Sequence, residues 1–216
     1  MVSIIIPTLN EAEQLPATLD ALADSGSPTE VIVVDAGSQD ATVLVAQQFG
    51  ARVLSSTKGQ RAAQMNAGAL AAQGEYFLFL HADTRLAPLA VGSVEEAFLD
   101  QGVVGCGFAR RFDSPSRFLG LTCYLAAWRG RCLGWFFGDQ AISVRRDAFT
   151  RIGGFRPWDA FEDLDLCRRL KAVGRMKLLR PAVVTSARRF EARGPVRRTV
   201  QDLWLTVHHL ATRGPD

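Results

Sequence analysis

Residues 31–38 read Val31-Ile32-Val33-Val34-Asp35-Ala36-Gly37-Ser38, a run of β-branched residues that leads into a carboxylate and a glycine. A short, continuous apolar run is typical of a strand buried on both faces of a parallel sheet. Val2 to Ile6 and Tyr76 to Leu80 have the same character, and Arg52 to Ser55 is a weaker strand. Because helical patterns separate these runs, the sequence predicts an α/β fold. Its central sheet would be Rossmann-like, doubly wound and mostly parallel, with helices on both faces.

Helix signals fill the links between these strands. Asn10 followed by Glu13 predicts a helix start ahead of leucines at helical spacing. Asp40 can cap a second helix, a third is expected from about Gln60 to Ala72, and Pro88 opens a fourth.

The second half of the chain is less regular. Strands are expected at Val103 to Phe112 and Ala141 to Val144, with one or two more within Met176 to Val184. Phe118 to Trp128 suits a helix, although its period is ambiguous. A helix from about Glu162 to Val173 would stop at the following glycine.

Composition limits the class of protein. A chain of 216 residues suits one domain, and 48% hydrophobic with 22% charged residues is a globular composition. A net charge of +3 is too small to indicate nucleic acid. Six residues without a basic leader precede Pro7, so we expect no signal peptide, and arginines interrupt the most apolar region. The four scattered cysteines favour reduced thiols in a cytosolic protein; they are Cys106, Cys123, Cys132 and Cys167.

Polar segments follow four of the predicted strands, at the edge where open α/β sheets bind ligands. They are Pro7 to Glu11, Asp35 to Asp40, Lys58 to Arg61 and His81 to Thr84. A carboxylate at the end of the second strand can accept hydrogen bonds from a ribose or a base. The glycine-rich turn of dinucleotide folds is missing after the first strand, so the sequence lacks the usual binding site for the diphosphate of NAD.

A metal-bridged diphosphate is a better match for this edge. Asp83 and His81 offer an oxygen and a nitrogen donor on one short loop. Carboxylate, water and phosphate oxygens suit Mg²⁺ or Mn²⁺, and an imidazole favours Mn²⁺. His81 could equally be a hydrogen-bonding loop residue.

Phe161-Glu162-Asp163-Leu164-Asp165-Leu166 places three carboxylates in an apolar context. Glu162 and Asp163 would lie in the first turn of a helix, where the helix dipole favours negative charge. They can therefore be a helix cap, a catalytic pair, or both. The dipole predicts a lowered pKa for a carboxylate in this place.

Several motifs occur together and in order. They are Ile4-Ile5-Ile6-Pro7-Thr8-Leu9-Asn10-Glu11, Val33-Val34-Asp35-Ala36-Gly37-Ser38, Asn66-Ala67-Gly68, His81-Ala82-Asp83, Gly153-Gly154-Phe155 and Glu162-Asp163. In this combination the sequence resembles the family 2 glycosyltransferases, whose catalytic domain has the GT-A fold. It looks most like a short bacterial, non-processive subgroup that carries Gly59-Gln60-Arg61-x-x-Gln64-Met65-Asn66 and Gly138-Asp139-Gln140.

The resemblance implies an inverting hexosyltransferase that moves one sugar from a UDP- or GDP-linked donor to an acceptor hydroxyl. Asp163 would be the general base, with Glu162 as the alternative, and Asp83 with His81 would hold Mn²⁺ or Mg²⁺. The residues placed around the nucleotide are Pro7, Thr8, Glu11, Asp35, Gly37, Lys58, Arg61 and Asn66. The residues placed on the acceptor side are Gly138, Asp139, Gln140 and Trp158.

We expect a single glycosyltransferase domain over 1–216, organised in three parts. About 1–100 would hold the nucleotide, about 101–185 would face the acceptor, and 186–216 would be a basic, amphipathic tail. The acceptor is unknown, with a lipid-linked molecule among the candidates and no nucleic acid expected. The tail could bind the diphosphate, rest on an anionic membrane from the cytoplasmic side, or be merely solvated.

Two departures from the family pattern leave alternatives open. His81 replaces the first acid of the Asp-x-Asp motif, which removes one charged metal ligand. The Gln-x-x-Arg-Trp motif of processive members is missing, which favours single-sugar transfer. A nucleotidyltransferase with a related α/β core, which would release pyrophosphate, is one alternative. The other is a nucleotide-sugar-binding protein without turnover. Arg61 has two interpretations, a phosphate contact or a salt bridge on a helix surface.

Overall fold

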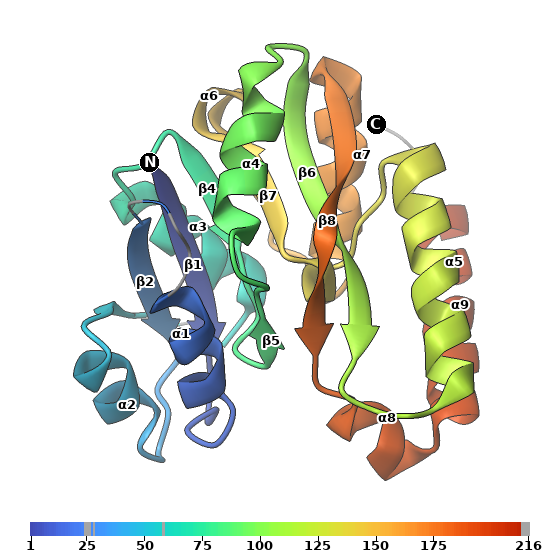
Figure 1. Ribbon diagram of the computed structural model, residues 1–216, viewed down its shortest axis with the longest axis horizontal. Coiled ribbons are helices and arrows are strands. Elements are labelled where there is room, and N and C mark those ends of the chain that lie inside the picture. Colours follow the sequence, from blue (N-terminus) through green and yellow to red (C-terminus); the bar gives the residue numbers. More distant parts are fainter. Residues whose placement is uncertain (24–26, 28, 58, 213–216) are drawn as a thin grey trace.

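The computed structural model describes residues 1–23, 27, 29–57 and 59–212 and shows a single curved sheet flanked by helices (Figure 1). The strands are β1 (Val2–Thr8), β2 (Thr29–Asp35), β3 (Arg52–Ser55), β4 (Tyr76–Phe79), β5 (Thr84–Arg85), β6 (Val103–Phe112), β7 (Ile142–Arg145) and β8 (Arg175–Thr185). The helices are α1 (Leu15–Ala23), α2 (Thr42–Gln48), α3 (Arg61–Ala71), α4 (Ala90–Leu99), α5 (Arg117–Leu133), α6 (Arg146–Arg151), α7 (Glu162–Val173), α8 (Arg188–Arg193) and α9 (Pro195–Thr212), with a 3₁₀ turn, η1 (Gly138–Gln140).

The sheet has the strand order β3-β2-β1-β4-β7-β6-β8-β5. Strands β3, β2, β1 and β4 pair in parallel, and β6 pairs in parallel with β8. Strand β7 is antiparallel to both of its neighbours, and the short β5 is antiparallel to β8. The mostly parallel sheet expected from the sequence is therefore confirmed.

Apolar side chains fill both faces of the sheet. Ile4 and Ile6 point into a core with residues of α1, α2 and α4, whereas Ile5 points into a second core with residues of α3, α6 and α7. This alternation is what a strand buried on both faces requires, because successive side chains leave a strand on opposite sides. The helices on both faces are thus confirmed.

One predicted helix start is wrong. Helix α1 begins at Leu15, five residues after Asn10. Asn10 has a left-handed backbone (φ 54°), and its Oδ1 accepts a hydrogen bond from the backbone N–H of Gln39. Its side chain therefore joins two loops at the sheet edge, and long-range bonding has overridden a local capping signal.

The irregular second half completes the other side of the molecule. The ambiguous segment Phe118 to Trp128 lies inside α5, which begins with Ser116 Oγ accepting from Leu119 N. Helices α8 and α9 follow β8, and α9 lies beside α5 (Figure 1). None of the helices among the described residues is long and apolar enough to cross a bilayer.

Candidate active site

Strands β1 and β2 end side by side and fix Asp35. Their register sets Thr8 opposite Asp35, and Thr8 Oγ1 donates to Asp35 Oδ1 at 3.1 Å. Asp35 Oδ2 accepts from the backbone N–H groups of Gly37 (2.9 Å) and Ser38 (2.8 Å). Gly37 has φ 89°, a conformation that glycine adopts without strain. The carboxylate is consequently buried and held in one orientation at the carboxyl edge of the sheet.

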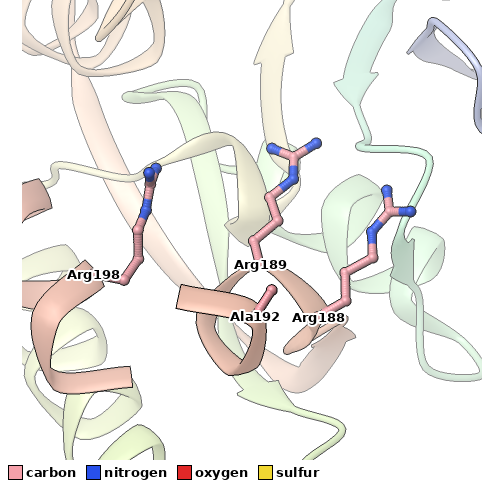
Figure 2. Close-up of a pocket in the computed structure, with 4 residues that line it drawn as sticks. All are labelled: Arg188, Arg189, Ala192 and Arg198. Carbon is pink, nitrogen blue, oxygen red and sulfur yellow. The ribbon is translucent and has the colours of Figure 1, made fainter. Parts of the chain in front are cut away.

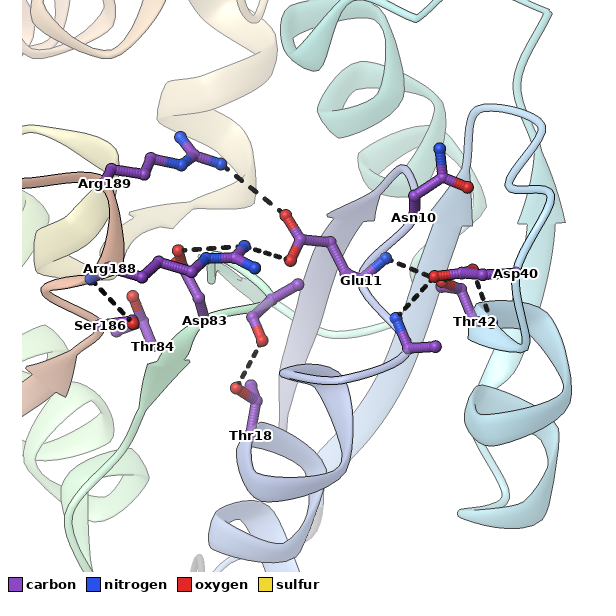
Figure 3. Close-up of polar contacts among 12 residues, drawn as sticks. Asn10, Glu11, Thr18, Asp40, Thr42, Asp83, Thr84, Ser186, Arg188 and Arg189 are labelled. Carbon is purple, nitrogen blue, oxygen red and sulfur yellow. Dashed lines mark hydrogen bonds and ion pairs between the residues drawn. The ribbon is translucent and has the colours of Figure 1, made fainter. Parts of the chain in front are cut away.

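Acidic and basic side chains face each other beside this edge (Figure 3). Glu11 follows β1 and forms an ion pair with Arg188 of α8, a residue 177 positions away in the chain. Arg188 Nη2 also lies 3.7 Å from Asp83 Oδ2, and Arg189 Nη2 lies 3.7 Å from Glu11 Oε1. The basic tail therefore reaches the crevice, and Arg188 is not merely a solvated charge.

A basic cavity continues from these arginines (Figure 2). Its volume is about 590 Å³, and it is lined by Arg188, Arg189, Ala192 and Arg198. Three guanidinium groups around one cavity suit an anionic group such as a phosphate, because arginine binds phosphate oxygens with two parallel hydrogen bonds.

His81 lies against the loop that precedes β7. A Cβ built on Gly138 would be 2.2 Å from His81 Nε2, so only glycine leaves room for this imidazole. Burial lowers the pKa of His81 to about 3, and the positive charges of Arg61 and Arg189 act in the same direction. The imidazole is therefore neutral at physiological pH, as a metal ligand must be.

The same glycine connects this loop with the start of α7. The backbone N–H of Gly138 donates to Asp163 Oδ2 at 2.6 Å, and Leu164 N donates to Asp163 Oδ1 at 2.7 Å. Phe161, the residue before α7, has φ 62°, which is uncommon for a bulky side chain. A strained residue next to an acidic pair is typical of functional sites.

Glu162 and Asp163 differ in what surrounds them. Glu162 is only 2% exposed, and its Oε1 lies 3.0 Å from Arg61 Nε. Glu162 Oε2 has no hydrogen-bond partner among the described residues. Asp163 is only half-buried, so it is the more accessible of the two carboxylates. Arg61 forms a salt bridge in the structure, and its contact with phosphate stays a prediction.

The expectation of a lowered pKa for the helix-start carboxylate is wrong. Burial raises the pKa of Asp163, and this outweighs the opposing effects of Arg61 and the Gly138 N–H group. Burial also raises the pKa of Glu162, and the negative charge of Asp163 adds to that rise. Desolvation of the charged form is therefore stronger here than the helix dipole.

The predicted acceptor-side residues Asp139, Gln140 and Trp158 each contact other segments of the chain, and their role toward an acceptor stays a prediction. Asp139 forms an ion pair with Arg110. Gln140 is buried, donates to Phe108 O at 2.9 Å and accepts from Arg129 Nη2 at 2.7 Å, so it fixes the loop. The ring of Trp158 lies 5.0 Å from that of His209 on α9.

Other predicted nucleotide residues have mixed positions. Pro7 is buried within β1. Both polar atoms of Asn66 bond to the backbone of Phe155, with Nδ2 donating at 2.8 Å and Oδ1 accepting at 2.9 Å. Asn66 thus holds a loop, and its contact with nucleotide stays a prediction. Lys58 lies outside the described residues.

Three residues of the site were not singled out from the sequence. Arg110 lies within strand β6, Arg129 within α5 and His209 within α9. Arg129 lies over the Phe137 ring, with its guanidinium carbon 4.0 Å from the ring centre. No local sequence motif identifies these three side chains. The one sequence feature that could have indicated a site residue is a charged side chain within an otherwise apolar element, as at Arg110.

The sheet order, the acid-lined carboxyl edge and the acidic helix start together define a GT-A type α/β domain. A family model described as glycosyl transferase family 2 matches residues 3–155. The chain belongs to this family.

Curated relatives match over part of their length. A PGL/p-HBAD biosynthesis glycosyltransferase of Mycobacterium bovis is 41% identical over 93 residues, covering 40% of this chain and 36% of the relative. An undecaprenyl-phosphate 4-deoxy-4-formamido-L-arabinose transferase of Pectobacterium carotovorum is 36% identical over 129 residues, covering 54% of this chain and 39% of the relative. The alignments thus span well under half of these proteins.

Solved structures share the fold. The mannosyltransferase PcManGT of Pyrobaculum calidifontis, solved with GDP-Man and Mn²⁺, superposes with a TM-score of 0.69 at 22% identity, covering 86% of this chain and 56% of that one. TarS of S. aureus superposes with a TM-score of 0.68 at 18% identity, covering 86% of this chain and 60% of that one. These likenesses confirm the GT-A fold.

Proposed function

We propose that the protein is an inverting glycosyltransferase that moves one sugar from a nucleoside-diphosphate sugar to an acceptor hydroxyl. The observation that carries the proposal is Asp163: a half-buried carboxylate that accepts from the Gly138 N–H group, beside His81, and whose pKa is raised by desolvation. A general base works best when its pKa is near the operating pH, so this rise favours catalysis.

In this proposal the reaction is one displacement at the anomeric carbon. The acceptor oxygen forms the new C–O bond while Asp163 takes the hydroxyl proton, and the nucleoside diphosphate leaves with the electron pair of the broken bond. Attack from the face opposite the leaving group inverts the anomeric carbon. Glu162 stays the alternative base, but its pairing with Arg61 makes it less accessible.

The donor would lie along the carboxyl edge, with residues 1–100 holding its nucleotide and 101–185 facing the acceptor. Asp35 would accept hydrogen bonds from the base or ribose, with Pro7, Thr8, Glu11 and Gly37 contributing to the same pocket. Arg188 and Arg189 supply positive charge for the diphosphate. UDP- and GDP-linked sugars are the candidates, since solved relatives were crystallised with UDP-GlcNAc and with GDP-Man.

Asp83 and His81 are the residues proposed to hold Mn²⁺ or Mg²⁺. The described residues contain no group of three or more His, Cys, Asp or Glu side chains that could cage a metal by themselves. These ions, however, often bind through one or two carboxylates plus substrate phosphates and water, so one carboxylate and a neutral imidazole fit. The bound metal would neutralise charge on the departing diphosphate.

The acceptor and the place of the reaction are also part of the proposal. A lipid-linked acceptor agrees with the relative named as an undecaprenyl-phosphate transferase. The protein would then work in the cytoplasm, at the inner face of the membrane.

Asp163→Asn tests the proposed base. The amide keeps the shape of the side chain but cannot accept the acceptor proton, so transfer should fall by about 10²- to 10⁴-fold. Nucleoside diphosphate binding, measured by calorimetry, should stay within a factor of a few. Glu162→Gln is the matched control and should lose less activity. Retained transfer in Asp163→Asn, with loss in Glu162→Gln, would move the base to Glu162.

A further inference from the structure

Helix α9 is amphipathic, and it turns its polar side toward the protein. Arg198 lines the basic cavity, and Asp202 pairs with it across one helical turn. The ring of His209, further along that side, lies 4.9 Å from the ring of Phe161. A surface helix normally buries its apolar stripe, so the orientation of α9 is the reverse of the usual one.

The apolar side of α9 is left in solvent. Val196, Val200, Leu203, Trp204 and Val207 recur at intervals that place them on one face of a helix. Their exposed fractions are 58%, 60%, 62%, 63% and 58%. A continuous exposed stripe of this length indicates an interaction surface rather than isolated surface residues.

Helix α5, which lies beside α9, carries a second exposed apolar stripe. Leu121, Tyr124, Leu125 and Trp128 again share one helix face, and Tyr124 is 71% exposed. The opposite face of α5 is already packed, because Leu119 is fully buried in a cluster with Phe112 and Ala187. The exposed stripe is therefore not needed to hold α5 on the domain.

We propose that the exposed faces of α5 and α9 together dock on an anionic lipid bilayer. Arg117, Arg131 and Arg197 are exposed on these two helices, and their one acidic residue, Asp202, is paired with Arg198. Basic residues beside an apolar stripe match the anionic lipid surface.

Two features favour lipid over a second copy of this chain. Tyr124, Trp128 and Trp204 are of the type enriched at membrane interfaces, where one end of the ring is apolar and the other is wet. A two-fold dimer would bring this surface onto a copy of itself, and the two helices of that copy offer the arginines no free carboxylate, because their one acid, Asp202, is paired with Arg198. Lipid headgroups neutralise those charges instead.

Docking of this surface on a bilayer does not depend on the proposed function. Only the consequence of docking for the reaction rests on that function. His209 of α9 contacts Trp158 and Phe161 next to the proposed base, so docking would place the acceptor side near the bilayer. The docking itself requires no sugar transfer and can be measured without substrate.

Vesicle binding tests the surface. The full chain is mixed with vesicles of phosphatidylcholine alone or with 30% phosphatidylglycerol, and binding is followed by co-sedimentation and tryptophan emission. We expect binding to the anionic vesicles, a blue shift of the emission and at least tenfold weaker binding to neutral ones. Trp204→Glu and, independently, Trp128→Glu should each weaken binding by about tenfold or more.

Leu70→Glu is the matched control, because Leu70 is 90% exposed on α3, away from this surface. It should bind as the unmodified chain does, and circular dichroism verifies that each variant is folded. The Asp163→Asn variant should also bind vesicles normally, which separates failure of docking from failure of the proposed activity. Absence of binding to anionic vesicles, or a dimer in sedimentation that Trp204→Glu dissociates, would overturn the proposal.

Discussion

Asp163 obtains its chemistry from residues that lie far from it in the sequence. Gly138 donates to its carboxylate, and Arg61 provides the nearby positive charge that opposes the rise of its pKa. The net effect is a raised pKa, because loss of water destabilises the charged carboxylate more than the nearby positive charge and hydrogen bonds stabilise it. The basicity of this side chain is thus a property of its surroundings.

Arg61→Gln tests that balance. Arg61 lowers the pKa of both Asp163 and Glu162, so its loss should raise both pKa values further. A base acts only when deprotonated, and the acidic limb of the rate profile should therefore move to higher pH. Transfer would fall more at pH 6 than at pH 8.5, as measured by product release across that range.

Arg61→Lys is the matched control for this prediction. It keeps the positive charge, so the acidic limb should stay close to that of the unmodified chain. An equal loss of transfer at all pH values in Arg61→Gln would mean that Arg61 acts by another route, such as a phosphate contact.

Helix α3 joins the two halves of the site through three side chains. Arg61 pairs with Glu162 at the start of α7. Gln64 Nε2 donates to the carbonyls that end β1 and β2, at 2.9 Å to Thr8 O and 2.7 Å to Val34 O. Asn66 binds the backbone of the loop that leads to α7. One helix therefore sets the position of the carboxyl ends of β1 and β2, the proposed nucleotide site, relative to the proposed base.

Asn66→Ala should loosen this connection. The substitution leaves the N–H and C=O groups of the buried Phe155 without their partners, which costs about 1–3 kcal/mol in the free energy of unfolding. Urea unfolding measures the loss. Gln47→Ala, which removes an exposed amide on α2, is the matched control and should change stability by about 0.5 kcal/mol or less. Equal losses in the two variants would contradict the bracing role of Asn66.

At the scale of the whole molecule, the site is assembled by the sheet order. Strand β7 pairs beside β4, which brings the Gly138 loop against His81. The chain then returns through β8, and α8 carries Arg188 to Glu11. Ligand binding at this crevice would therefore restrain segments from both ends of the chain.

A nucleoside diphosphate with Mn²⁺ should accordingly stabilise the whole fold. At 100 times its dissociation constant a ligand adds about 2.7 kcal/mol to the free energy of unfolding, which for this size raises Tm by roughly 5–10 °C. UDP and GDP are compared by thermal shift, and EDTA should remove most of the effect. A shift that is unchanged by EDTA would contradict the metal site, and no shift with either nucleotide would count against the proposed donor.

Much of the fold was predictable because its signals are local. The β-branched runs at Val31 to Val34 and Val2 to Ile6 became β2 and β1, and the carboxylate after the first of them lies at the sheet edge, as expected. Asn10 shows where prediction from local sequence patterns fails. Its sequence pattern is typical of a helix cap, but in the structure its side chain accepts a hydrogen bond from the backbone N–H of Gln39, in another loop.

The amino-acid sequence by itself determined the family, the acidic residues available for chemistry and the order of the elements along the chain, apart from the short β5, α6 and α8. The hydrophobic period, the β-branched side chains and the helix-capping residues act over a few neighbouring residues, so they can be recognised in the sequence before the fold is known. Only the tertiary structure decided that Arg188 meets Glu11, that the pKa of Asp163 rises and that α9 turns its apolar face outward. Those outcomes depend on desolvation and on contacts between distant segments, which exist only once the chain is packed.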